Sequence, residues 1–482
     1  MEELREKAKA LIDPTAAKKA EEEAKRAREL ATPINSNVRS AAAERFARGL
    51  VQKEAAGQMM INDAAKRWKG SILAVKKTAY ADTEKIDPLI QVLQLGSGTA
   101  KVAAAGALAN LALGKDENKL YIAAQDVITN FLELYKESEA GQHPSLVALA
   151  NIAGDDMVKD LLVYEGAVET LKDSLTSNSP AESKGAAVIL AVNLASRDDG
   201  REALVTHGVH KLLIQAMKSE APEVKSNAAA AVANIAFFKD NCDPMIKAGV
   251  IPVLVSVLQE GTDSAKSNVC LALSILSATS VENAVLLEEA GAVVPLVEHL
   301  KTTSGNVQLS ACQAIANMAC AKQVKVALTE AGVIEPLVSI LCNGSAPAQR
   351  SAAAGLANLA NAGNEEKIAE LGAIPVLVGL LTSQPASRVT AAKALANLAS
   401  VDVIRTQITE AGAILPLMNI LNAEQWDGVA ACALALARLS LDAPTKKKII
   451  EMKGLDILSK RLKSAPPEAQ ASLASALQNL AI

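Results

Sequence analysis

A short apolar motif recurs at a nearly constant step along most of the chain, and this period constrains the fold more than any other feature. Each copy is a Gly followed by apolar residues, often with a Pro. Two degenerate copies, EKIDPL from Glu84 and DVITNF from Asp126, precede the others at the same step. Such a period indicates stacked helical units, each in contact only with its neighbours. The glycines of the motif are 42, 41, 42, 41, 40, 40 and 42 residues apart and lie at Gly166, Gly208, Gly249, Gly291, Gly332, Gly372, Gly412 and Gly454.

A second motif, Ala-Leu-Ala-Asn-Leu-Ala and its variants, has the same period. Its Asn is replaced at two steps, by Ile275 and Arg438. Residues one after the Asn position, two before it and five before it are apolar or small at every step, which predicts the buried stripe of a helix. Cys270 and Cys312 belong to this stripe and are interpreted as core residues. The Asn residues are Asn110, Asn151, Asn193, Asn234, Asn317, Asn358, Asn397 and Asn479.

Each unit is predicted to contain three helices. A short first helix, such as 322–330, ends at the Gly, because Gly adopts a left-handed turn at little cost. The Pro of the motif then lies in the first turn of a second helix, where its missing N–H costs nothing. A polar loop such as 302–306 follows, and the third helix carries the Asn motif.

These two motifs resemble the armadillo repeat of β-catenin and importin-α. The resemblance implies an all-α fold, a right-handed superhelical solenoid of about ten armadillo repeats with three helices each. It covers residues 66–482, and residues 1–65 are predicted to be a charged helical N-terminal extension. A small excess of Lys and Arg before residue 85 fits either an autoinhibitory or targeting arm or a solvated lead-in.

In the armadillo family, the third helices line a concave groove, and the Asn side chains there hydrogen-bond the main chain of an extended peptide. An amide can do this because it offers both donors and an acceptor. The alternative is that each Asn ties neighbouring repeats together. By resemblance, the predicted partner-binding groove consists of Asn110, Asn151, Asn193, Asn234, Asn317, Asn358, Asn397 and Arg438.

Ile275 and Arg438, which replace the Asn, are expected to differ in how they contact a partner. Ile275 cannot grip a peptide amide, Arg438 would favour a nearby carboxylate, and both could equally be neutral drift. A basic column nine residues before the Asn, half a turn away, is either a strip for an acidic partner or a solvated face. It consists of Lys101, Lys184, Lys225, Lys266 and Arg388.

Recognition of a nuclear localisation signal by importin-α also requires a Trp four residues before the Asn. No Trp stands there: the positions hold residues such as Gly106, Val147 and Lys393, and the only tryptophans are Trp68 and Trp426. The function of a classical nuclear-import adaptor is therefore not expected. The fold resembles importin-α without its Trp array.

Composition and motifs exclude other classes. The net charge of -4 argues against nucleic acid as a partner, and no apolar run approaches the length of a membrane span. Six scattered cysteines without a CxxC pair, and a charged start MEELREKAKA, predict a cytoplasmic protein, with a nuclear or cytoskeleton-associated location as alternatives. The chain stops just after the last Asn motif, so self-association through a bare C-terminal repeat is a further expectation.

Catalytic motifs are missing from the sequence. There is no P-loop, no GxGxxG after a strand and no GxSxG. Of the four His, His207 and His210 have an i, i+3 spacing, but no neighbouring motif completes a metal site. No enzyme activity, cofactor or metal is predicted.

The predicted function is a non-enzymatic scaffold or adaptor that binds extended or helical segments of other proteins. The alternative is a structural component of a large cytoskeletal assembly, such as the armadillo proteins of the ciliary axoneme. There the outer surface would matter more than the groove. Regulation of a small GTPase is a third class, which no residue selects.

Overall fold

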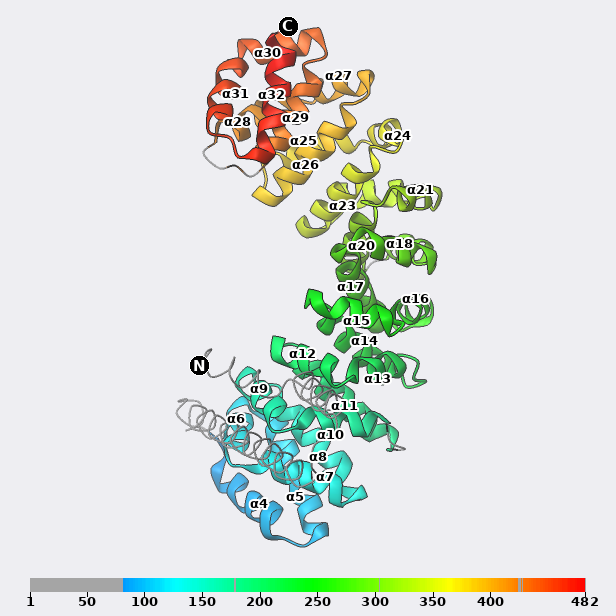
Figure 1. The fold of residues 1–482 in the computed structure, drawn as a ribbon, viewed down its shortest axis with the longest axis vertical. Helices are drawn as coiled ribbons and strands as arrows, with labels where there is room; N and C mark the ends of the chain where they lie inside the picture. The colour runs from blue at the N-terminus through cyan, green and yellow to red at the C-terminus, as the bar shows by residue number, and fades with distance from the viewer. Residues whose placement is uncertain (1–80, 177–178, 303, 424–425, 427, 482) are drawn as a thin grey trace, which may run out of the picture. The chain divides into compact units, whose positions relative to one another are not determined.

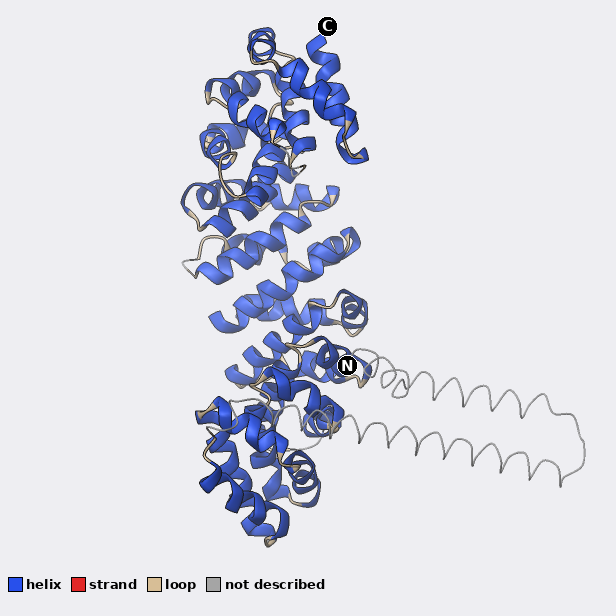
Figure 2. Cartoon of the chain, turned by 90° about the vertical axis from the view of Figure 1, so that its left-hand side faces the viewer, coloured by secondary structure: helices blue, strands red, loops and turns tan. Residues whose placement is uncertain are grey.

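The computed structural model describes residues 81–481, except 177–178, 303, 424–425 and 427. The predicted extension 1–65 and the predicted domain start at residue 66 lie outside the described residues. Every regular element among the described residues is a helix, as Figure 2 shows. The chain forms two compact units, which divide between Val209 and His210.

Unit 1 contains α4 to α12. Its helices are α4 (Thr83–Leu95), α5 (Gly98–Gly114), α6 (Asp116–Ala124), α7 (Val127–Glu137), α8 (Glu139–Ile152), α9 (Asp156–Tyr164), α10 (Ala167–Thr176), α11 (Ala181–Leu194) and α12 (Asp198–Thr206).

Unit 2 contains α13 to α32. In chain order, its first half is α13 (Val209–Ala216), α14 (Pro222–Ala236), the 3-10 helix η2 (Lys239–Asn241), α15 (Cys242–Lys247), α16 (Val250–Glu260), α17 (Asp263–Thr279), α18 (Val281–Glu289), α19 (Val293–His299) and α20 (Gly305–Met318). The second half is α21 (Lys322–Glu330), α22 (Ile334–Asn343), α23 (Ala346–Leu359), α24 (Glu365–Glu370), α25 (Ala373–Leu380), α26 (Pro385–Leu398), α27 (Asp402–Glu410), α28 (Ile414–Asn422), α29 (Val429–Leu439), α30 (Ala443–Glu451), α31 (Gly454–Lys463) and α32 (Pro467–Ala481).

The predicted three-helix repeat is confirmed. A short first helix, a second helix and a longer third helix alternate, and successive third helices pack against one another. In unit 1 these are α5, α8 and α11, and in unit 2 they are α14, α17, α20, α23, α26, α29 and α32 (Figure 1). The apolar stripe of the Asn motif forms this contact. Leu108, Leu149, Leu273 and Leu356 are at most 1% exposed, and each such side chain contributes about 1.5–3 kcal/mol to folding.

The glycine turn is confirmed with one correction. The motif glycines from Gly166 to Gly412 have positive φ, between 75° and 92°. At Gly454 the prediction is wrong, because Lys453 takes the left-handed conformation with φ 60°. Gly454 instead opens α31 where there is no room for a side chain: an added Cβ would lie 2.5 Å from Cγ2 of Ile449. In the degenerate copy, Asp126 takes the left-handed role with φ 59°.

The prolines and cysteines lie where the sequence predicts. Pro252 and Pro336 are third residues of α16 and α22, within the first turn. Cys270 and Cys312 are fully buried, and burial raises the pKa of each thiol to about 12. They are small core residues, as predicted.

The C-terminal repeat differs from expectation. No large apolar side chain of α31 or α32 is among the exposed ones in the described part of the chain. The outward residues of α32 are small or polar, such as Gln470, Ala474 and Gln478. Self-association through this repeat stays a prediction, and no exposed apolar patch supports it.

Candidate partner-binding face of the third helices

The Asn side chains of unit 1 cross from one third helix to the preceding one. Nδ2 of Asn151 donates to the carbonyl oxygen of Ala109 at 2.9 Å. Nδ2 of Asn193 donates to that of Ala150 at 2.8 Å. Ala150 lies in the last turn of α8, where carbonyls have no partner within the helix. Each Asn therefore satisfies a carbonyl and fixes the register of two repeats.

Unit 2 repeats this geometry. Nδ2 of Asn317 donates to the carbonyl of Ser274 at 2.9 Å, and that of Asn358 to Ala316 at 2.9 Å. Nδ2 of Asn397 donates to Ala357 at 2.8 Å and that of Asn479 to Ala437 at 2.7 Å. We call these positions rungs. The alternative that the Asn ties neighbouring repeats is thus observed at six of the eight Asn positions, and the role in partner binding stays a proposal.

Arg438, which replaces Asn at its rung, makes the same contact with the preceding third helix and one more. Its Nη1 donates to the carbonyl of Ala396 at 2.6 Å and to Oδ1 of Asn397 at 3.3 Å. No carboxylate pairs with Arg438 among the described residues. A longer cationic donor can therefore hold two repeats together as an amide does, which explains why the substitution is tolerated.

At the rung of Ile275, the tie comes from two turns earlier on the same helix. Nδ2 of Asn268 donates to the carbonyl of Ser226, 42 residues before it, at 3.1 Å. The hydroxyls of Ser226 and Ser264 also form a hydrogen bond of 2.7 Å. Ile275 itself is half-buried. The missing amide is thus replaced, and the rung position is left apolar.

The remaining predicted residues lie at equivalent places. Asn110 is exposed near the end of α5, and Asn234 is half-buried near the end of α14. The rung face is the side of the third helices that carries the rungs. It includes the residues four and eight positions before each rung and the residue three positions after it. The structure places all eight predicted residues on this face, within their own units.

The basic column nine residues before the rungs has a structural role at one position. Nε of Arg388 donates to the carbonyl of Ser383 at 2.5 Å. Gln308 and Gln349 occupy the equivalent positions of α20 and α23, and their Nε2 atoms donate to the carbonyls of Leu300 and Leu341. A long polar side chain here satisfies carbonyls at the end of the preceding second helix. This observation favours neither alternative for the four lysines.

Sequence reasoning missed a second set of amides, which lie in or beside the first helices. Asn118, Asn241, Asn283 and Asn364 are at most 7% exposed. Their Nδ2 atoms donate to carbonyls at the end of the preceding third helix, for example Asn118 to Leu111 at 3.0 Å and Asn364 to Leu359 at 3.1 Å. Their spacing from the rung varies, so no fixed motif reveals them. They secure the turn between consecutive repeats.

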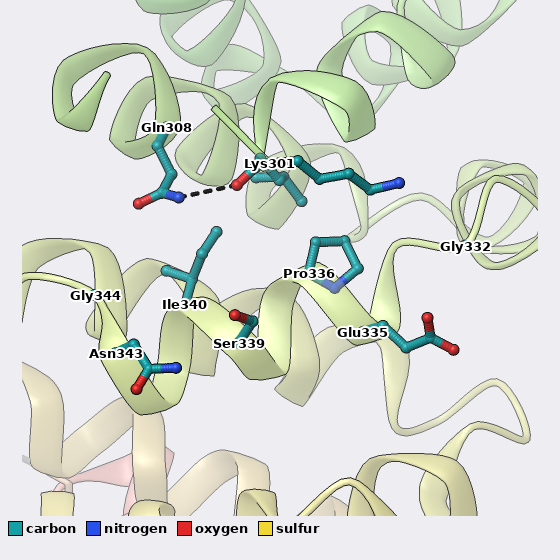
Figure 3. A pocket seen from close by; sticks show the side chains of 10 residues that line it. Lys301, Gln308, Gly332, Glu335, Pro336, Ser339, Ile340, Asn343 and Gly344 are labelled. Atoms are coloured by element: carbon teal, nitrogen blue, oxygen red, sulfur yellow. Dashed lines mark hydrogen bonds between the residues drawn. The ribbon is translucent and has the colours of Figure 1, made fainter. Parts of the chain in front are cut away.

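An open cleft of 460 Å³ lies between the second helices of two consecutive repeats of unit 2 (Figure 3). Its lining includes Lys301, Glu335 and Ser339, without His or Cys. The hydrogen bond from Gln308 to the carbonyl of Leu300 closes one side. The rungs lie on the third helices, so the cleft belongs to a different surface.

The histidines show how charge is handled in unit 1. His207 follows α12, where its Nδ1 lies 2.8 Å from the carbonyl of Ala203 and its Nε2 lies 3.0 Å from Oε1 of Glu169. The hydrogen bond with Glu169 raises the pKa of His207, and the same bond lowers the pKa of Glu169. His210 is buried in α13. Among the described residues, no group of three His, Cys, Asp or Glu side chains could hold a metal.

Taken alone, no described helix has the length and hydropathy of a segment that crosses a membrane. Within the described part of the chain, one pair of helices, 239–247 and 250–260, reaches that length and composition together, with a bend of 88° between them.

The helices define an all-α solenoid of three-helix repeats, and known proteins agree with this class. The sequence profile of the armadillo/beta-catenin-like repeat matches residues 197–237 and 322–360. The chain is 29% identical to an engineered protein of known crystal structure, with a TM-score of 0.74 over 83% of this chain and 99% of that one. The chain belongs to the armadillo repeat family.

Two further similarities were found. A designed armadillo repeat protein is 30% identical over 48% of this chain and 99% of its own, with a TM-score of 0.46. Protein CELLULOSE SYNTHASE INTERACTIVE 3 of Arabidopsis thaliana is 28% identical over 226 residues. That match covers 45% of this chain and 10% of the relative, so the chain spans about a tenth of the relative's length. Armadillo repeats generally bind other proteins, and the fold is typically a non-enzymatic scaffold.

Proposed function

We propose that the chain is a non-enzymatic scaffold or adaptor, which binds segments of partner proteins along the rung face. The single observation that carries this proposal is the state of the rung amides. Nδ2 of Asn193 and Nδ2 of Asn317 each donate one hydrogen bond to the preceding repeat. Nδ2 of Asn358 donates two, to the carbonyl of Ala316 and to Sγ of Cys320. A side-chain amide has a second N–H and an oxygen with two lone pairs. Rungs such as Asn193 and Asn317 therefore keep a donor and an acceptor for the main chain of a bound segment.

The surroundings of the rungs support this use. Four residues before them stand small or half-buried side chains, such as Ala230, Gln313 and Ala354. A backbone can approach such a surface closely, and repeated amides can hold it without reading side chains. The relative from Arabidopsis is named for interaction with cellulose synthase. We transfer from it only the general role of interacting with another protein.

A structural role in a large cytoskeletal or axonemal assembly is the second candidate. It is favoured by exposed apolar residues on the first and second helices, where Val294 is 58%, Leu415 57% and Val403 68% exposed. Such an assembly would use these helices rather than the rung face. A cytoplasmic location fits both functions and is part of the proposal.

The experiment compares two blocked surfaces, because Asn→Ala would remove architecture together with binding. Ala230→Arg with Ala354→Arg fills the rung face and leaves every rung intact. Val294→Arg with Leu415→Arg changes the second helices instead. Both variants and the wild-type chain are used as bait in cell lysate, and captured proteins are compared by mass spectrometry.

We expect partners to be lost from the Ala230→Arg, Ala354→Arg variant and kept by the other. Loss only from the Val294→Arg, Leu415→Arg variant would contradict the proposal and favour the structural candidate. Urea unfolding of both variants serves as the control, since surface substitutions usually change the free energy of unfolding by less than about 0.5 kcal/mol.

A further inference from the structure

The rung face of unit 2 carries cations and no carboxylate. The helices α20, α23, α26 and α29 contain no Asp or Glu. Three basic side chains lie on this face on three successive third helices, in an otherwise acidic protein. They are Arg350, eight residues before its rung, Lys393, four before, and Arg438, at the rung. Arg350 and Lys393 are exposed, and Arg438 is half-buried.

Three other arginines of the described chain are neutralised by nearby carboxylates. Nη2 of Arg197 lies 2.8 Å from Oδ2 of Asp160, and Nη1 of Arg201 lies 2.5 Å from Oδ1 of Asp198. Arg405 pairs with Asp402 in the same way. Arg350, Lys393 and Arg438 form no such ion pair within the described residues.

The three unpaired cations lie on helices that pack side by side in the order α23, α26, α29. Packed helices are about 8–10 Å apart, close to one Debye length at physiological salt. The cations therefore repel one another, and their potentials add. A partner that supplies carboxylates would relieve the repulsion and be attracted over a distance.

The same face becomes apolar at α14 and α17. Ile275 replaces the amide rung, and Leu271, one turn before it, is half-buried. At the end of α14, Phe237 is 54% and Phe238 36% exposed. Only four phenylalanines occur in the whole chain, and two of them lie at the end of α14, the helix that packs against the α17 helix of Ile275. Buried aromatic and aliphatic contacts commonly dominate binding energy at interfaces.

Between these two regions lie amide rungs. Asn317 on α20 and Asn358 on α23 lie between Ile275 on α17 and Lys393 on α26. The distance from α17 to α26 is therefore three helix-to-helix steps. At about 9 Å a step this is roughly 27 Å, which an extended chain covers in about eight residues. Apolar anchor, neutral amides and cations thus succeed one another along the face.

From this order we propose that unit 2 binds an extended acidic segment of a partner protein, with an aromatic or large aliphatic residue seated at α14–α17. Its carboxylates pass Arg350, Lys393 and Arg438, which lie about five, eight and eleven extended residues from the apolar residue. This inference rests on the proposed function and names the chemistry of its partner. Nucleic acid is disfavoured as the occupant, because its affinity depends on many cations along the phosphates and the chain has a net charge of -4.

The test selects peptides with the full-length chain. A phage library of random 16-residue peptides is panned on the wild type, on Arg350→Glu with Lys393→Glu, and on a matched control, Lys447→Glu, which alters a cation of α30 that is 80% exposed. The enriched peptides are sequenced, and one is labelled for fluorescence anisotropy.

We expect the wild type and Lys447→Glu to enrich Asp and Glu about eight residues from Phe, Trp or Leu, in either chain direction. The double charge reversal should shift the selected peptides toward Lys and Arg. It should also weaken binding of the acidic peptide by at least about tenfold. Phe237→Ala should also weaken it, without changing the charge preference. Melting curves show that each variant is folded.

No enrichment, or the same sequences from the wild type and the charge reversal, would overturn the inference. So would an apolar anchor without charge preference. A labelled oligonucleotide that binds the wild type and displaces the peptide would assign the face to nucleic acid. If the Ala230→Arg, Ala354→Arg variant still loses partners from lysate while the library shows no acidic preference, the proposed function stands and this inference fails.

Discussion

The rung faces of the two units share their amide rungs and differ in charge. In unit 1, Gly106, Val147 and Ile189 stand four residues before the rungs, and no Lys or Arg lies on the rung face of its described third helices α5, α8 and α11. In unit 2, Lys393 and Arg350 are exposed there without an acidic partner. Rungs that recur in both units are part of the architecture. Cations that occur in only one unit are better candidates for selecting a partner.

The largest effect expected from this comparison is on folding. Asn151→Ala with Asn193→Ala in unit 1, and Asn317→Ala with Asn358→Ala in unit 2, each remove two hydrogen bonds that join consecutive third helices. Each lost hydrogen bond should cost about 0.5–1.5 kcal/mol, so both pairs should lower the free energy of unfolding by similar amounts in urea titrations. Gln313→Ala is the control. A pair that leaves stability unchanged would show that its rungs are not architectural.

The second prediction concerns cations that are added to the rung face of unit 1. Val147→Lys with Ile189→Lys places cations on the rung face of unit 1. With unit 2 disabled by Arg350→Glu and Lys393→Glu, these additions should restore several-fold tighter binding of an acidic peptide in anisotropy measurements. Raising the salt concentration should weaken the restored binding, because the charges are exposed. Restoration by Val147→Gln with Ile189→Gln would instead indicate that polarity suffices.

The third prediction concerns the replaced tie in unit 2. Asn268→Ala removes the hydrogen bond to Ser226 and should cost about 1 kcal/mol. Adding Ile275→Asn should recover much of this loss, because the new amide can reach the carbonyl of Ala233, 42 residues before it. Differential scanning calorimetry of the two single variants and the double variant measures the coupling. Additive losses would mean that the two positions are independent.

The smallest expected effect is a pH dependence in unit 1. The pKa of His207 is raised, so its stabilising contribution is complete below the unfolded value of 6.5 and is lost as pH rises through the folded value. Both partners are partly exposed, so the change should be below about 1 kcal/mol. Urea midpoints between pH 6 and pH 9 measure it, and His207→Gln should flatten the profile. An unchanged profile in that variant would assign the dependence to another group.

The fold could be predicted because its signals are local and repeated. A Gly that must take positive φ and a Pro in a first turn follow from the backbone alone. Gly454 was misjudged because Lys453 takes the left-handed conformation there, while close packing against Ile449 gives Gly454 a different role. Sequence spacing shows where a turn falls, and it does not show which of two adjacent residues bends.

The sequence predicts which positions form the candidate site. It does not predict which groups the side chains at these positions hydrogen-bond. The rung residues could be found from their period, but whether an amide faces a partner or the next repeat depends on the distance between helices. Asn268 could not be found, because it ties two repeats from a position that carries no rung motif. Asn283 could not be found, because it bonds a carbonyl of the preceding third helix at a spacing that varies between repeats. The cations of the rung face could be singled out only from the structure, because it shows which other Lys and Arg side chains form ion pairs.

The central claim, that partners bind on the rung face, is tested most directly by photo-crosslinking. A benzophenone amino acid is placed at Gln313 on the rung face, or at Val294 or Leu415 on the second helices, and the chain is irradiated in cell lysate. The account predicts crosslinked partner proteins from position 313 and few from positions 294 and 415. Crosslinks from the second helices alone would contradict it and show that the chain works through its outer surface.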